Sequence, residues 1–352
     1  MSKLCAHFGT CGGCLMQDMP RDVYRAAKRE MVLSALARYT IEAEVAGIVC
    51  VPENSRRRAV LKAAKKSGAV ALGFRARASH DIVDMQECRV LTKAILSALP
   101  KLRSMMSALL RDGEEVELHL TDTETGLDLA LNSKRALKPA LTAELARRAN
   151  EAKLARITLN GEVAVELARP VVRFGKVEVA LPATAFLQPT REGEVVLQQL
   201  ARDALAGAKR IADLFSGCGT FSLVLAEKAR IHAVEREPAM LAALTEAARH
   251  AQGLKPVTTE ARDLFKLPLT PPELKVYDAV LLDPPRAGAA AQVRELAASQ
   301  FRRIAYVSCN PESFARDARV LIDAGFRIGT VTPVDQFLWS DHLELVALFA
   351  RR

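Results

Sequence analysis

The chain has 352 residues, half of them hydrophobic, and a formal net charge of +9, a composition that excludes a disordered protein. No apolar run is long enough to span a bilayer, and the opening MSKLCAHFGT lacks a signal-peptide pattern, so we expect a cytoplasmic protein that is not attached to a membrane. The positive charge is uneven, because residues 1–111 hold 19 Lys and Arg against 9 Asp and Glu, while the remainder is close to neutral. This asymmetry predicts a polyanionic partner that is met mainly through the N-terminal part.

Cysteines gather at the start of the chain, where Cys5, Cys11 and Cys14 have the spacing C-x5-C-x2-C and Cys88 is a distant fourth. The total of seven cysteines is odd, and in a reducing compartment metal binding or catalysis is more common than disulfide formation. Zinc ribbons normally use two close C-x2-C pairs, which this spacing does not provide. The pattern therefore favours a [4Fe-4S] cluster, with zinc as the alternative.

The first predicted region, residues 1–185, is rich in short strands. A basic run leads through Gly68 into an apolar strand, which predicts a hairpin with a basic tip. The residues of that run are Arg56, Arg57, Arg58, Lys62, Lys65 and Lys66. The other expected elements are helices at 20–39, 91–110 and 139–150, and strands at 45–51, 70–74, 115–121, 126–131, 157–159, 163–167 and 177–181.

The second predicted region, residues 186–352, alternates helices and strands, which predicts an α/β domain with a doubly wound, mostly parallel sheet. The last two strands are separated by only a turn, so we expect them to pair antiparallel at one edge of the sheet. The expected strands lie at 210–214, 231–235, 256–258, 277–282, 303–308, 326–332 and 343–350.

A nucleoside-binding pattern opens this second region. The strand at 210–214 runs into D-x-F-x-G-x-G and then a helix, and Glu235 ends the next strand, where an acidic residue accepts ribose hydroxyls. The loop lacks a third glycine and basic residues for a pyrophosphate, which favours S-adenosylmethionine over NAD. Asp263 follows the third strand and is placed to meet an adenine amino group, with a helix cap as the alternative.

A fourth strand ends in Asp283-Pro284-Pro285-Arg286. Methyltransferases that modify exocyclic amines have an aromatic residue after a similar Pro-Pro pair, so Arg286 argues against amine chemistry. Enzymes that make 5-methylcytosine place a cysteine at this strand end, and this chain has none.

Cys309 follows a short apolar strand, and Asn310-Pro311 then begins a helix whose N-terminus favours a thiolate. The alternative is a small buried hydrophobic residue. A thiolate that adds to C6 of a pyrimidine turns the poorly nucleophilic C5 into an enolate carbon, and a base must then remove the C5 proton. Glu344, expected on the edge strand, fits that base, with a surface carboxylate as the alternative.

These motifs together resemble the bacterial RNA (uracil-5-)-methyltransferases over nearly the whole chain. The segments that carry the resemblance are the cysteine spacing, FLQP at 186–189, DLFSGCGTFSL at 213–223, LDPPRAG at 282–288, VSCNP at 307–311 and HLELV at 342–346. The resemblance implies a Rossmann-like class I methyltransferase domain in which Cys309 is the nucleophile and Glu344 the base. It also implies S-adenosylmethionine contacts from Gln188, Phe215, Thr220, Glu235, Asp263 and Asp283, and a structural [4Fe-4S] cluster on Cys5, Cys11, Cys14 and Cys88. Gln188 and Asp283 are expected to touch the target base as well.

Family members differ in what precedes the cluster. The enzymes for uridine 1939 of 23S rRNA carry an N-terminal TRAM barrel, which we do not find here. The architecture is therefore similar to that of the uridine-747 enzymes. The C-x5-C spacing, however, is closer to that of the 1939 type. The basic segment 56–66 is then expected to take over part of the RNA contact, and the helix within 18–44 to pack on the catalytic domain. The expected partner is RNA, above all 23S rRNA with a flipped-out uridine, met by a monomer with no obligate protein partner. The alternatives are the same chemistry on tRNA and a non-catalytic iron–sulfur RNA-binding factor.

Overall fold

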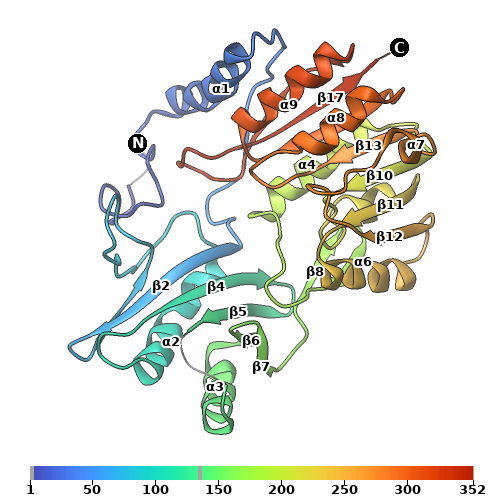
Figure 1. Ribbon diagram of the computed structural model, residues 1–352. Helices are drawn as coiled ribbons and strands as arrows, with labels where there is room; N and C mark the ends of the chain where they lie inside the picture. The colour runs from blue at the N-terminus through green and yellow to red at the C-terminus, as the bar shows by residue number, and fades with distance from the viewer. Residues whose placement is uncertain (1–3, 134–136, 352) are drawn as a thin grey trace.

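The computed structural model describes residues 4–133 and 137–351. Two sheets dominate it, one built mainly from the second half of the chain and one built from residues 58–166 (Figure 1). We call them the C-terminal sheet and the N-terminal sheet. Within the described residues, no helix is both long and apolar enough to cross a membrane.

The C-terminal sheet has the strand order β1-β16-β17-β14-β13-β10-β11-β12, and β15 also pairs with β17. The strands from β14 to β12 in this order are mutually parallel, and β13 is buried along its whole length, as expected for a sheet covered on both faces. The strands are β1 (Val49–Cys50), β10 (Arg210–Leu214), β11 (Arg230–Glu235), β12 (Val257–Ala261), β13 (Ala279–Leu282), β14 (Arg303–Ser308), β15 (Arg327–Ile328), β16 (Thr332–Asp335) and β17 (Glu344–Ala350).

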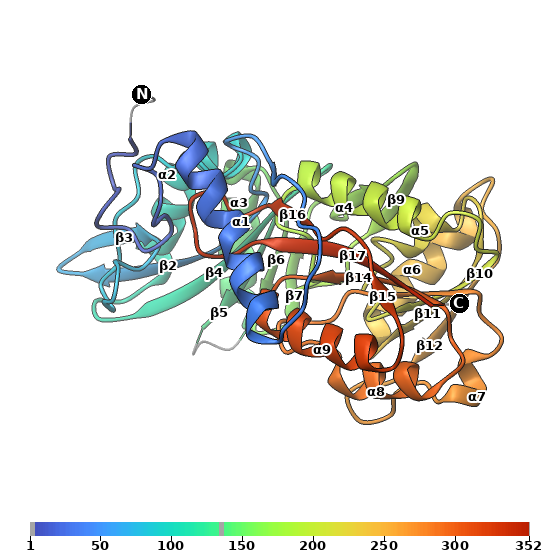
Figure 2. The same ribbon diagram turned by 90° about the horizontal axis from the view of Figure 1, so that it is seen from above.

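Helices cover both faces of this sheet, as Figure 2 shows from above. Two of them begin at side-chain caps: the Thr190 hydroxyl accepts from the Gly193 N–H at 3.1 Å, and the Asn310 side chain accepts from the Glu312 N–H at 3.1 Å. The second cap is the one predicted beside Cys309. The helices are α4 (Arg191–Ala204), α5 (Ser222–Leu225), α6 (Pro238–His250), α7 (Pro271–Leu274), α8 (Ala290–Ala298) and α9 (Pro311–Asp323).

Strand β17 corrects one prediction. It does not lie at the edge of the sheet but between β14 and β16, antiparallel to both. The edge is formed by β1, a strand from the N-terminal part of the chain that pairs parallel with β16. Sequence order alone could not place β1 there, because the pairing joins residues almost 300 positions apart.

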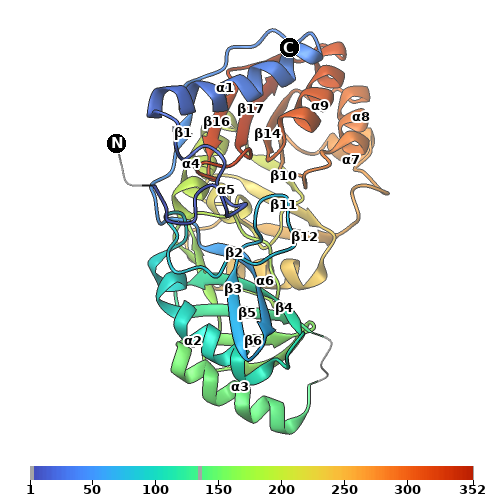
Figure 3. The same cartoon turned by 90° about the vertical axis from the view of Figure 1, so that its left-hand side faces the viewer.

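The N-terminal sheet has the order β3-β2-β4-β5-β6-β7 and packs on two helices through a separate apolar core, as seen in the lower part of Figure 3. Its elements are β2 (Arg58–Lys66), β3 (Ala69–Gly73), α2 (Lys93–Leu109), β4 (Glu115–Thr123), β5 (Gly126–Asn132), α3 (Pro139–Ala152), β6 (Leu154–Leu159) and β7 (Glu162–Glu166). A hairpin of β8 (Val171–Phe174) and β9 (Val177–Ala180) then leads to the C-terminal sheet. The predicted boundary after residue 185 stays a prediction.

Helix α1 (Arg21–Arg38) lies against α9 rather than against the N-terminal sheet (Figure 1). Lys28 on this helix is fully buried, and its ammonium group donates to Asp335 at 2.9 Å and also to the His342 carbonyl. The Tyr24 hydroxyl contacts Asp335 as well, and it accepts from the Trp339 N–H at 2.8 Å. Helix α1 thus holds the segment between β16 and β17.

The predicted hairpin is present, since β2 and β3 pair antiparallel around the turn at Ser67-Gly68, with Lys65 and Lys66 beside that turn. The prediction is wrong for the three arginines, which lie at the opposite end of β2. Arg57 is buried and donates to Glu194 at 2.5 Å, and Arg58 stacks over the Phe186 ring at 4.7 Å. Arg57 and Arg58 join the two sheets instead of facing solvent, because they find acceptors or a ring on the 186–194 segment, whereas Arg56 stacks over the Phe337 ring at 5.7 Å.

Candidate active site and cysteine pocket

One pocket lies at the carboxyl ends of the parallel strands, with a volume of about 460 Å³, within the range of sites for drug-sized ligands. Each strand contributes the residue at its end or just beyond it. All of the residues predicted from the sequence for methyl transfer line this one pocket: Gln188, Phe215, Thr220, Glu235, Asp263, Asp283, Cys309 and Glu344.

The loop after β10 is shaped for close approach of a ligand. Phe215 has a φ of +66°, a strained value for a side chain of this size, and its ring packs against Phe265 with centroids 5.5 Å apart. Gly219 has a φ of +97°, and a Cβ there would come within 2.5 Å of Leu244. The loop therefore needs glycine for both its backbone angle and its packing.

Two carboxylates border this loop. Glu235 accepts from the Gly217 N–H at 3.1 Å and from the Arg236 N–H at 2.7 Å, so its carboxylate is held at the end of β11. Asp263 accepts from the Phe265 N–H at 3.0 Å, which is the capping contact considered as its alternative role. Asp263 nevertheless lines the pocket, so one carboxylate can stabilise the turn and face a ligand.

The Asp283 carboxyl is the last member of a series of hydrogen-bonded side chains at the base of the pocket. Gln188 donates to Asp283 at 3.4 Å, and its own carbonyl oxygen accepts from Gln336 at 2.9 Å. Gln336 accepts in turn from the Thr190 hydroxyl at 3.0 Å. Burial, with Asp213 adding to it, raises the pKa of Asp283 to about 8.

Cys309 and Glu344 lie on neighbouring antiparallel strands. Ser308 pairs with Leu345, so Cys309 and Glu344 are the next opposite positions in the same register, at the end of β14 and the start of β17. Glu344 is only 4% exposed, which rules out a surface carboxylate. Its place opposite Cys309 follows from the inner position of β17.

The protonation of this pair differs from the prediction. Burial raises the pKa of Cys309, the nearby carboxyl groups of Glu344 and Asp283 add to the rise, and together they bring this pKa to about 12. The adjacent helix N-terminus does not outweigh these effects, so the resting group is a thiol. Burial also raises the pKa of Glu344 well above its usual range, with Asp283 as the second cause.

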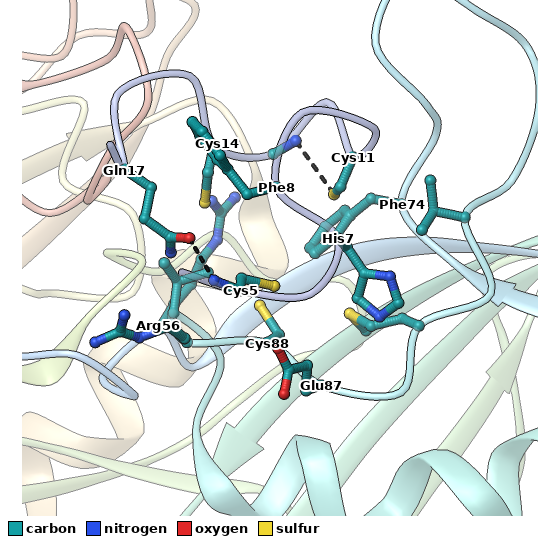
Figure 4. A pocket seen from close by; sticks show the side chains of 15 residues that line it. Cys5, His7, Phe8, Cys11, Cys14, Gln17, Arg56, Phe74, Glu87 and Cys88 are labelled. Carbon is teal, nitrogen blue, oxygen red and sulfur yellow. Dashed lines mark hydrogen bonds between the residues drawn. The ribbon is translucent and has the colours of Figure 1, made fainter. Parts of the chain in front are cut away.

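The four predicted cluster ligands, Cys5, Cys11, Cys14 and Cys88, surround a second, smaller pocket (Figure 4). The free space between its side chains is about 30 Å³, room for roughly one water molecule. Burial raises the pKa of Cys14 to about 12, and the neighbouring Cys88, Cys11 and Cys5 add to that rise in this order. Among residues 4–133 and 137–351, no three His, Cys, Asp or Glu side chains are close enough together to hold a single metal ion.

Residues 133–352 match the family described as tRNA (Uracil-5-)-methyltransferase. The chain belongs to this family. It is 45% identical to an uncharacterised RNA methyltransferase of Brucella suis, over 99% of this chain and 84% of that protein. It is also 32% identical to the 23S rRNA (uracil(1939)-C(5))-methyltransferase of Shewanella piezotolerans, over 99% of this chain and 82% of that protein.

The fold agrees with this assignment. The Pyrococcus abyssi tRNA (uracil-54, C5)-methyltransferase, solved in complex with S-adenosyl-L-homocysteine, superposes with a TM-score of 0.76 at 23% identity. The match covers 97% of this chain and 86% of that one. The predicted α/β methyltransferase fold, with its mixed sheet, is thereby confirmed. The family match and the relatives confirm the assignment to an RNA methyltransferase.

Several side chains of this methyltransferase support residues of the site without lining the pocket, and this role was not predicted from its sequence. Gln336 and Thr190 hold the Gln188 side chain in place. Arg57 donates both to the Gln188 backbone carbonyl at 3.1 Å and to the Glu194 carboxylate. Burial raises the pKa of Glu194 to about 7 even with Arg57 beside it. A local pattern could not have revealed them, since each acts through a partner distant in the sequence.

The cysteine loop of this methyltransferase touches the segment that leads to Glu344. The backbone N–H groups of Leu15 and Met16 donate to the Trp339 carbonyl at 2.6 and 3.0 Å, and Arg89, next to Cys88, stacks over the Trp339 ring at 5.4 Å. The cysteine loop therefore contacts the connection between β16 and β17, which leads to Glu344 in the active-site pocket.

Proposed function

We propose that this protein transfers a methyl group from S-adenosylmethionine to C5 of a uridine in 23S rRNA. The observation that carries the proposal is the opposition of Cys309 and Glu344 across one strand ladder, at the wall of a pocket large enough for a nucleoside cofactor. A nucleophile and a base on one ladder suit the C6 addition and the C5 deprotonation that methylation of a uracil requires.

The pocket walls fit S-adenosylmethionine. Glu235, Asp263 and Phe215 line the pocket, where the two carboxylates would accept from ribose hydroxyls and an adenine amino group and the ring would offer an aromatic face. Ser216 also lines the pocket, and within the described residues its buried hydroxyl has no hydrogen-bond partner, which favours a polar ligand beside it. When bound, S-adenosylmethionine supplies an electrophilic methyl group and a positive charge that favours ionised Glu344 and Asp283.

Cys309 and Glu344 then carry out the reaction on the uracil ring. The Cys309 thiol first loses its proton to solvent, its sulfur bonds to C6 of the uracil, and the electron pair of the C5–C6 double bond moves onto the C4 carbonyl as an enolate. C5 of this enolate then takes the methyl group, and the electron pair of the broken sulfur–methyl bond stays with the cofactor, which would leave as S-adenosylhomocysteine. Glu344 takes the proton from C5, the double bond reforms, and the S–C6 bond breaks to return the thiolate. The register of β14 and β17 supports this assignment because it presents the Cys309 sulfur and the Glu344 carboxylate side by side at the carboxyl end of β14.

The cysteine pocket is proposed to hold a [4Fe-4S] cluster. Four thiols around one space fit this group chemically, and the C-x5-C-x2-C spacing with a remote fourth cysteine favours a multi-iron cluster over zinc. The cluster is assigned no step in methyl transfer.

The choice of RNA is tested by mapping. Purified protein is incubated with labelled S-adenosylmethionine and unmodified transcripts of 23S rRNA or tRNA, and the products are digested and examined by mass spectrometry for 5-methyluridine. The identity to the uridine-1939 enzyme favours a 1939-type target, whereas the similarity in architecture noted from the sequence favours uridine 747. Label in tRNA alone would overturn the rRNA assignment, and label in neither would overturn the activity.

The mechanism has a separate test. Glu344→Gln leaves the adduct unable to lose its C5 proton, so a protein–RNA band that survives denaturing electrophoresis is expected to accumulate. Cys309→Ala is the matched control, because the adduct needs the thiol. A Glu344→Gln protein with wild-type turnover and no adduct would remove Glu344 from the role of base.

A further inference from the structure

Gln336 is buried beneath the pocket, with 1% of its surface exposed. It does not line the pocket and cannot touch a substrate, yet its amide lies between Thr190 and Gln188. It is also tightly enclosed: a Cβ built on Gly193 would come within 2.3 Å of its side chain. The amide therefore has little room to rotate.

The donor and the acceptor of each hydrogen bond in the series Thr190, Gln336, Gln188 and Asp283 can be assigned in turn. The Thr190 hydroxyl is fully buried and already accepts from the Gly193 N–H, so its own proton goes to the Gln336 carbonyl oxygen. The Gln336 amide nitrogen must then donate to the Gln188 carbonyl oxygen. This leaves the Gln188 amide nitrogen on the side of Asp283, where it donates at 3.4 Å.

The direction of the Gln188 amide matters for base choice. Gln188 and Asp283 line the same pocket as Cys309 and Glu344. Uracil presents the O4 carbonyl as an acceptor beside its N3–H donor, whereas cytosine presents an N4 amino donor beside a bare N3. An amide nitrogen and a carboxylate oxygen match uracil. A Gln188 amide turned by 180° would offer its oxygen instead and would match the amino group of cytosine.

We propose that Gln336 is a positioning residue that fixes the Gln188 amide with its nitrogen toward the pocket and thereby selects uracil over cytosine. The proposal rests on the proposed function, since it assumes that a uracil enters this pocket. It assigns to Gln336 an effect on base selection that passes entirely through Gln188.

Gln336→Met keeps the volume of the side chain but removes both hydrogen bonds. Its kcat on the mapped rRNA transcript is expected to fall about 10- to 100-fold, as for other small losses of positioning, while the KM for S-adenosylmethionine changes by less than about twofold. Gln292→Met is the matched control: Gln292 is equally buried and bonds the Leu269 backbone at 2.8 and 3.0 Å, far from the pocket lining. The control is expected to lose stability and keep its kcat.

A double-mutant cycle separates positioning from a general structural role. If Gln336 acts only through Gln188, then Gln188→Ala together with Gln336→Met loses no more activity than Gln188→Ala alone. Losses that multiply would overturn the proposal, and so would a Gln336→Met protein that loses only stability, as the control does.

Base selection is measured without chemistry. In a Cys309→Ala background, the affinity is compared for the mapped transcript and for the same transcript with the target uridine replaced by cytidine. We expect at least about a tenfold preference for uridine that drops toward one when Gln336→Met is added. An unchanged ratio would overturn the selectivity, whereas a wild-type protein that methylates no RNA would refute the proposed function itself.

Discussion

The two pockets of this protein are built in opposite ways. The active-site pocket of about 460 Å³ is formed by the ends of strands, and its acidic and amide side chains are held by hydrogen bonds to neighbouring backbone or side chains. The cysteine pocket of about 30 Å³ is formed by a loop together with residues of the 83–90 segment, and the Cys11 sulfur accepts a hydrogen bond from the Gly13 N–H at 3.4 Å.

This difference indicates which site is ready for its ligand. The active-site pocket has its side chains in place before any ligand binds, because the sheet supports them. The cysteine pocket has its four thiols around one small space, and within the described residues no three of them are close enough to share a single metal ion, so its working form depends on what the thiols bind. The following experiments test this distinction.

The largest effect is expected for Cys309→Ala. Methyl transfer should fall by at least about 10³-fold, because the thiol that attacks C6 is removed and the neighbouring Ser308 hydroxyl already donates to the Asn310 carbonyl. Affinity for S-adenosylmethionine, measured by calorimetry, should remain, since the pocket walls are preserved. Cys50→Ala, which alters a half-buried thiol on β1, is the control and should keep full activity. A Cys309→Ala protein that no longer binds the cofactor would show that the pocket is not held by the sheet alone.

The pH dependence of the chemical step is the next largest effect. The pKa values of Cys309 and Glu344 are both raised, and both groups act in their deprotonated forms. The single-turnover rate should therefore rise with pH, by up to roughly tenfold per unit between about pH 6 and 8. A rate that is flat over this range would mean that the bound cofactor and RNA have already deprotonated both groups.

The smallest effect on the active-site pocket is expected for Cys14→Ser. Anaerobically purified protein should lose the broad absorbance near about 400 nm expected of a cluster, and residues 5–17 should exchange amide hydrogens faster. Affinity for S-adenosylmethionine should change by less than about twofold, while turnover falls more, because the Leu15 and Met16 contacts to Trp339 are lost. Stoichiometric zinc in the colourless wild-type protein would contradict the cluster, and a large loss of cofactor affinity would contradict the independence of the pockets.

Much of the active-site pocket could be predicted because its parts are local. The loop after β10, the Asp283-Pro284-Pro285 turn and the Cys309-Asn310-Pro311 turn are each encoded by a few consecutive residues at the end of a buried strand. Parallel strands bring such ends to one edge of a sheet whatever lies between them. Predicted residues therefore met in one pocket although they are spread over more than 150 positions.

The rest depends on contacts that no short pattern encodes. The inner position of β17 follows from its pairing with both β14 and β16, and the burial of Arg57 follows from Glu194 on a distant helix. The helix after Asn310 suggested a thiolate, but the pKa of Cys309 is set mainly by the surrounding protein and by carboxyl groups from two other strands. These properties arise only when remote segments pack together.

The pairing of β14 with β17 places a limit on how this protein can vary in length. Because side chains alternate between the two faces of a strand, one residue inserted within β17 after Leu345 would turn Glu344 to the face opposite Cys309. An extra residue in the exposed turn around Gly325 would leave the pairing intact. The two insertion variants should therefore differ. The insertion within β17 is expected to give a protein that folds but does not transfer methyl groups, and the insertion near Gly325 is expected to leave methyl transfer unchanged.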